Sequence, residues 1–170
     1  MQQNGCKLKI VTIENAFLLP EVIKYLMKGK QVSLRLTGYS MRPFLENKRD
    51  VGVFKQSETY SVGDVVLAQL TETKYVVHRI ISIKNNLVTL RGDGNLLCEN
   101  CLITDIKAIA IGFYRKGKSQ MISTQSIKWR LLSKIWTSLF PIRRPLLFCY
   151  RVKLKIGEKL ISHQRLFNIF

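Results

Sequence analysis

A series of short strand-like runs between residues 31 and 114 constrains the fold of this chain more than any other feature. In the first run, Val32, Leu34 and Leu36 alternate with polar residues, which is the pattern of a half-buried strand. We expect further strands in these ranges: 50–55, 65–70, 75–83, 87–90 and 107–114. Helical segments do not alternate with them, so the pattern predicts a mostly β fold and argues against a parallel β-α-β sheet.

A short helix is expected before the first strand, over residues 20–29. Pro20 suits the first helical turn, where its missing N–H is not needed, and Gly29 suits the end. Apolar residues recur between them at helical spacing: Val22, Ile23, Leu26 and Met27. Further along, Asn85 and Asn86 are predicted to form the tight turn of a β-hairpin.

The charge of the chain is concentrated in its last third. The whole chain has 28 basic and 11 acidic residues, a net charge of +17, and residues 115–170 hold 13 of the basic residues but one acid, Glu158. Residues 1–114 therefore carry 15 basic and 10 acidic residues, a net of +5. Such asymmetry points to an anionic partner, namely a membrane surface, nucleic acid or an acidic protein. The alternative is a solvated basic face without a partner.

Residues 126–140 are predicted to form a basic amphipathic helix that Pro141 ends, and a second basic and apolar stretch follows over 143–156. This composition is typical of a helix lying in a membrane interface. An anionic membrane surface is thus a candidate partner of residues 126–156; alternatively, or in addition, the apolar face packs on the β body. We expect a β domain over residues 1–118, with its core at 30–115, and a basic amphipathic extension over 119–170. Few aromatic residues alternate with the basic ones, which disfavours nucleic acid as the partner.

The four cysteines, Cys6, Cys98, Cys101 and Cys149, are too few for a disulfide scaffold in a chain of 170 residues. Cys98 and Cys101 form a lone CxxC pair without two further ligands nearby, so no metal and no cofactor is predicted. We find no secretory signal and no apolar stretch of about 18 residues. The expected location is cytoplasmic, or peripheral at the inner face of the membrane.

Ser40 is a candidate nucleophile in the segment Gly38–Pro43. A serine nucleophile needs an exposed hydroxyl on a rigid turn, a base within hydrogen-bond reach and backbone donors for the oxyanion. Gly38 lets the backbone approach a substrate carbonyl closely, and Pro43 stiffens the far side of the turn. Taken alone, the segment also fits an ordinary turn at the end of a strand.

His78 is the histidine of the strand region, and the other histidine, His163, is near the C-terminus. A polar ring in an otherwise apolar strand needs a partner. A lone histidine in a strand usually has a structural role, but with Ser40 in the same β region His78 is also a candidate general base.

Five segments resemble, in order, the conserved boxes of the signal peptidase I and LexA-type serine peptidases: Gly38–Pro43, Arg49–Val51, Gly63–Val66, Val77–Ile80 and Arg91–Asn95. The resemblance covers roughly residues 30–115. Each box alone is common, and the specificity comes from the five in the family order. The family fold is a mostly antiparallel β structure, which is therefore the fold that the resemblance implies.

The family divides by its general base. The bacterial-type signal peptidases and LexA-like proteins use lysine, whereas the endoplasmic-reticulum and archaeal type uses histidine at the box where this chain has His78. The resemblance therefore implies a Ser40–His78 dyad. Imidazole, with an ordinary pKa of about 6.5, is a competent base near neutral pH. Lys74 is a poor substitute, because four residues of strand separate the two Cα atoms by about 13 Å at ~3.3 Å per residue.

Two acids are candidates to orient the His78 ring. Asp93 lies in the last of the five boxes, and Glu99 lies where relatives of the histidine type place an aspartate. Both remain candidates, with Asp93 favoured for structure. The resemblance also implies that the backbone N–H of Ser40 binds the oxyanion and that Gly38, Met41 and Pro43 shape the substrate side. Gly38 stands where some relatives have a donating serine, so it supplies no side-chain donor.

Typical relatives carry an N-terminal membrane anchor or a DNA-binding domain, and we expect neither in this chain. The resemblance implies a serine endopeptidase that cleaves a leader, signal or other precursor peptide through an acyl-enzyme. The alternative is a catalytically inactive module of the same fold that binds a peptide or a membrane.

Overall fold

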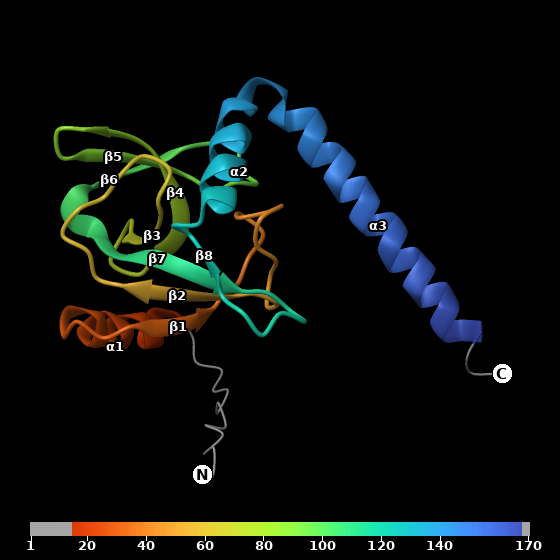
Figure 1. Cartoon of the computed structure of the whole chain (residues 1–170), viewed down its shortest axis with the longest axis horizontal. Coiled ribbons are helices and arrows are strands. Elements are labelled where there is room, and N and C mark those ends of the chain that lie inside the picture. The colour runs from red at the N-terminus through yellow and green to blue at the C-terminus, as the bar shows by residue number, and fades with distance from the viewer. Residues whose placement is uncertain (1–14, 168–170) are drawn as a thin grey trace, which may run out of the picture.

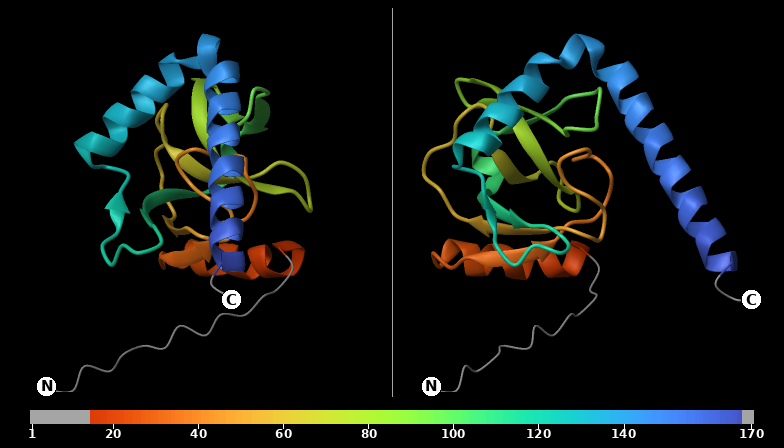
Figure 2. Two further views of the ribbon diagram at one scale, coloured as in Figure 1. Left: turned by 90° about the vertical axis from the view of Figure 1, so that its right-hand side faces the viewer. Right: turned by 45° about the vertical axis from the view of Figure 1, so that its right-hand side comes forward.

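The computed structural model describes residues 15–167 and shows a mostly β body with helices at both ends (Figure 1). All strand pairs are antiparallel, in the order β1-β2-β7-β3-β4-β5-β6, and β8 pairs with β7, so the sheet has eight strands. The sheet curls into a half-barrel (Figures 1 and 2). Its strands are β1 Val32–Arg35, β2 Val51–Lys55, β3 Val65–Gln69, β4 Tyr75–Lys84, β5 Leu87–Arg91, β6 Glu99–Leu102, β7 Ile106–Tyr114 and β8 Ile122–Ser123.

The six expected strands and the hairpin turn are confirmed, since Asn85 takes the left-handed conformation (φ 54°) between β4 and β5. Strands β6 and β8 were not expected from the sequence. The β6 segment, Glu-Asn-Cys-Leu, has two polar residues at its start, and β8 is two residues long. Neither has an apolar pattern of its own, so each depends on a neighbouring strand for its hydrogen bonds.

Helix α1 spans Asn15–Met27 and begins five residues earlier than expected. The placement of Pro20 in the first turn was wrong, because Pro20 lies inside the helix. A proline there leaves one backbone carbonyl of the preceding turn without its helical N–H partner. Packing compensates for this loss, since Leu19, Val22 and Leu26 are buried against the sheet.

Two groups of buried side chains fill the body. The first joins α1, the segment after β1, the sheet and Trp129, and consists of Leu19, Val22, Leu26, Met41, Leu45, Phe54, Val65, Leu67, Ala108, Ala110, Phe113 and Trp129. The second consists of Val66, Ala68, Ile80, Val88, Leu90, Cys101, Ile106 and Ile109. Neighbouring residues of β3, Val65 and Val66, enter different groups because successive side chains of a strand point to opposite faces.

The C-terminal part contains α2 (Ile127–Ser138), a short 3-10 turn (Phe140–Ile142) and α3 (Arg143–Phe167). The Ser126 hydroxyl caps α2 by accepting from Trp129 N at 3.3 Å. Trp129 is buried, with its ring centroid 5.0 Å from that of Phe113, so α2 packs on the body. Residues after 118 thus contribute both β8 and a core tryptophan. The start of the expected β domain, residues 1–14, and the end of the expected extension, residues 168–170, lie outside the described residues.

Helix α3 starts next to α2 and diverges from the β body toward the C-terminal end of the helix (Figures 1 and 2). Within residues 15–167, no helix is long and apolar enough to cross a membrane.

Candidate active site

Ser40 lies in the irregular segment that joins β1 to β2. Gly38, two residues earlier, has a φ of +92°, a left-handed conformation that favours glycine, and its N–H donates to Asn47 Oδ1 at 2.9 Å. At the far end of the segment, the buried Asp50 carboxylate accepts from Glu46 N at 2.9 Å and from the Arg49 guanidinium at 2.7 and 2.8 Å. Burial alone would raise the pKa of Asp50, but these contacts outweigh it and hold the pKa below its ordinary value. The segment is therefore closed by hydrogen bonds at both ends.

A second loop, Gly92–Asn95, lies directly against Ser40. Gly94 N–H donates to the Ser40 carbonyl at 2.7 Å. A Cβ on Gly92 would lie 2.4 Å from the Ser40 carbonyl oxygen and 3.0 Å from Ser40 Cβ. Only glycine allows so close an approach of two backbones, so the glycines of this loop set the position of Ser40.

The strand register places His78 near the end of β5, from which this loop continues. In the β4–β5 pair, Ile80 lies opposite Leu90 and Arg79 opposite Arg91. The loop that lies against Ser40 therefore begins where β5 ends, one residue beyond the pair of Arg91 with Arg79, the neighbour of His78.

His78 is buried, with 4% of its surface exposed, and its Nδ1 lies 2.8 Å from Glu99 Oε2. The two atoms are within hydrogen-bond range, but the contact does not have hydrogen-bond geometry. Burial lowers the pKa of His78 below its ordinary value, and the charge of Glu99 offsets part of that effect. Because a carboxylate only accepts, a neutral His78 ring carries its proton on Nδ1, toward Glu99, and its Nε2 lone pair can then act as a base.

Glu99 comes from β6, which the sequence did not predict, and reaches His78 because β6 pairs with β5, with Leu90 opposite Glu99. Its other oxygen, Oε1, accepts from Lys74 Nζ at 2.8 Å. Burial alone would raise the pKa of Glu99, but the contacts with Lys74 and His78 together hold it below its ordinary value. Glu99 is thus an ionised carboxylate between a lysine and the candidate base.

Asp93, the other candidate acid, faces a different partner. Its two oxygens accept from Arg79 Nε at 2.9 Å and Nη2 at 2.7 Å, and both side chains are buried. The third arm of Arg79, Nη1, donates to the Gly63 carbonyl at 2.8 Å. Asp93 therefore holds the Gly92–Asn95 loop to β4, whereas Glu99 is the acid that contacts the His78 ring.

The other residues predicted for the site differ in how deeply they are buried. The Met41 side chain is 6% exposed and belongs to the first core group, while Pro43 is partly exposed. The N–H of Gly38 is already bonded to Asn47. The backbone N–H of Ser40, the predicted oxyanion donor, has no hydrogen-bond partner among residues 15–167. Within the same range, no hydrogen bond joins the Ser40 hydroxyl to the His78 ring, a contact that often tightens only when substrate binds.

No model of a known protein family and no curated protein matches this sequence.

Proposed function

We propose that this protein is a serine endopeptidase of the signal-peptidase and LexA-like kind, with Ser40 as nucleophile and His78 as general base. The observation that carries the proposal is the juxtaposition of three segments. Gly94 N–H donates to the Ser40 carbonyl at 2.7 Å, the loop that contains Gly94 directly follows β5, whose last residue Arg91 pairs with Arg79 next to His78, and Glu99 Oε2 lies 2.8 Å from His78 Nδ1.

In the proposed reaction, Ser40 Oγ attacks a peptide carbonyl while His78 Nε2 takes the hydroxyl proton. The proton then passes to the leaving amine, and a water molecule hydrolyses the acyl-enzyme with the same ring as base. The Ser40 N–H donates to the oxyanion. The negative Glu99 carboxylate stabilises the imidazolium that forms in both steps. The proposed substrate is a leader, signal or other precursor peptide in an extended conformation.

The experiment is active-site labelling with a serine-directed acylating probe, with the labelled residue located by mass spectrometry. We expect the label on Ser40 in the wild-type protein, none in Ser40→Ala, and labelling slowed by about 10²-fold or more in His78→Ala. The matched controls are Ser61→Ala, an exposed serine in another turn, and His163→Ala; both are expected to label at the wild-type rate. Labelling that persists in Ser40→Ala would overturn the proposal.

A further inference from the structure

Over residues 143–156, helix α3 contacts the body through one side. On that inner side, Arg143 and Leu147 are 2% and 5% exposed, and Tyr150 O–H donates to Glu46 Oε1 at 2.6 Å. Glu46 in turn accepts from Arg42, two residues after Ser40, at 2.8 Å. The inner side of α3 is therefore held against the segment that carries the proposed nucleophile.

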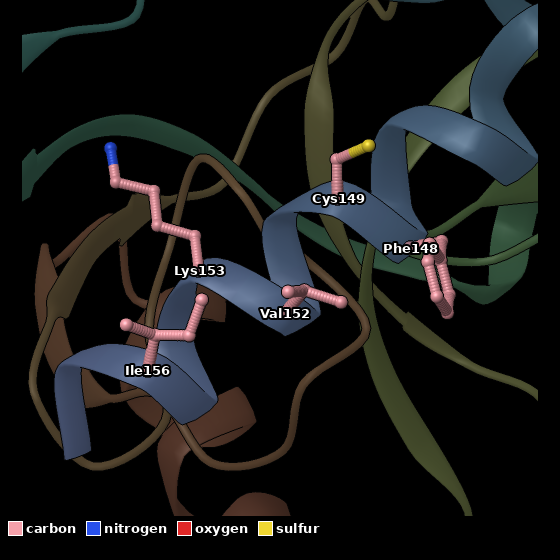
Figure 3. A pocket seen from close by; sticks show the side chains of 5 residues that line it. All are labelled: Phe148, Cys149, Val152, Lys153 and Ile156. Carbon is pink, nitrogen blue, oxygen red and sulfur yellow. The ribbon is translucent and has the colours of Figure 1, made fainter. Parts of the chain in front are cut away.

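The opposite side of α3 carries an apolar stripe with nothing packed on it among the residues that the structure describes. Phe148, Val152 and Ile156, which we call the outer stripe, recur every four residues and are 68%, 39% and 55% exposed. Together with Cys149 and Lys153 they line one shallow hollow along the helix (Figure 3). Adjoining exposed apolar side chains on one face offer a surface for contact with another apolar surface.

Basic side chains border the outer stripe. At about 100° per residue, helical geometry puts Arg144 and Lys155 along one border and Lys153 along the other, while Arg151 lines a hollow toward Tyr39 on the inner side. All four are exposed, and residues 143–156 contain no acidic residue. An apolar stripe between two cationic borders matches the chemistry of a lipid surface, with acyl chains beneath the stripe and anionic headgroups beside the cations.

We propose that the outer stripe of α3 docks this protein on an anionic lipid bilayer. A second copy of the chain is a poorer occupant, because two copies would bring their cationic borders together. Nucleic acid would match the cations but leave the apolar stripe without a partner. Since the inner side of the same helix contacts the segment after Ser40, docking holds that segment close to the lipid surface.

The test is co-sedimentation of the purified full-length protein with vesicles, either of phosphatidylcholine alone or of phosphatidylcholine and phosphatidylglycerol in equal parts. We expect strong binding to the anionic vesicles, weak binding to the neutral ones, and loss of binding as salt is raised. Val152→Glu is expected to lower the partition coefficient at least tenfold, because it places a charge in the stripe. Its control is Val62→Glu, an equally drastic change at a valine of the β body that is 62% exposed, which should bind like the wild type.

The charges are tested separately. At about 1 kcal/mol, or roughly fivefold, for each basic residue near the surface, replacing Arg144, Lys153 and Lys155 by Gln should weaken anionic binding about a hundredfold. The control makes the same change at three exposed lysines of the body, Lys28, Lys55 and Lys84. It should weaken binding to the anionic vesicles by a factor several times smaller.

Several results would overturn the docking proposal. These are equal binding to both vesicle types, no binding, equal binding of Val152→Glu and Val62→Glu, and a wild-type chain that self-associates through the stripe instead. Salt-sensitive binding to RNA with no binding to vesicles would assign the cations to nucleic acid. Ser40→Ala should bind vesicles like the wild type, so failure of docking and failure of the proposed peptidase function are separate results.

Discussion

His78 Nδ1 lies 2.8 Å from Glu99 Oε2, and the other oxygen of the same carboxylate lies 2.8 Å from Lys74 Nζ. The lysine donates a hydrogen bond to the carboxylate, and the carboxylate lies against the imidazole, so the charges of the three side chains are coupled. In the proposed reaction, His78 takes the hydroxyl proton of Ser40, and Glu99 stabilises the imidazolium that results.

The first prediction concerns Glu99. Glu99→Gln removes the negative charge that stabilises the imidazolium but keeps the shape of the side chain, so labelling of Ser40 should slow by about 10²-fold. The rate is measured with the serine-directed probe at neutral pH. Glu72→Gln, at an exposed glutamate of the turn between β3 and β4, is the matched control and should leave the rate unchanged. An unchanged rate in Glu99→Gln would remove Glu99 from the mechanism.

The pH dependence of labelling gives a second prediction. Burial lowers the pKa of His78, so the neutral, basic form persists below the ordinary value of about 6.5, and the acid limb of the labelling rate should lie below that pH. Glu99 raises this pKa and Lys74 lowers it. The limb should therefore move to lower pH in Glu99→Gln and to higher pH in Lys74→Met. Shifts in the opposite directions would show that another group limits the rate.

The strands of the sheet follow from local patterns, and the site follows from pairing that no local pattern shows. Alternation in the segment Val32–Leu36 and the Val- and Ile-rich run of β4 were enough to place those strands. The choice between Asp93 and Glu99 was not local. It depends on β6 pairing with β5, and β6 begins with two polar residues.

Side-chain direction was the other limit. Met41 directly follows Ser40, and its side chain points into the core, where it is 6% exposed. The sequence did not show this direction. The distance along the strand argued against Lys74 as the base. It could not show that Lys74 contacts Glu99, because these two residues are 25 positions apart in the sequence. Likewise, the contact between Tyr150 and Glu46 spans 104 residues, so the basic, apolar pattern of α3 alone could not show which side faces the body.

A third prediction separates the roles of the two acids. Asp93→Ala leaves the fully buried Arg79 guanidinium without its carboxylate, which should lower the free energy of unfolding by about 3–5 kcal/mol. Urea denaturation measures the loss. The double variant Arg79→Met with Asp93→Ala removes the charge itself and should recover most of the stability. Glu99→Gln, by contrast, should change the labelling rate far more than the stability, because Glu99 is partly exposed to water.

The double variant also guards against a trivial result. If Asp93→Ala and the double variant were equally unstable, the loss would come from the loop backbone rather than from the uncompensated Arg79 charge. That outcome would contradict the structural role of Asp93 as the carboxylate that neutralises Arg79.

The last prediction tests the close approach that brings Ser40 beside the strand pair. In Gly92→Ala the new Cβ would meet the Ser40 carbonyl oxygen at 2.4 Å, and because that atom is backbone, the segment that carries Ser40 must move. A displacement of about 1 Å at a reacting group can cost 10²-fold in rate, so labelling should fall by that order. The control is Gly112→Ala, where the new Cβ would lie 2.6 Å from the Met121 side chain, which can rotate away. Circular dichroism and the urea midpoint show whether each variant stays folded. A folded Gly92→Ala protein that labels at the wild-type rate would mean that the position of Ser40 does not depend on the Gly92–Asn95 loop.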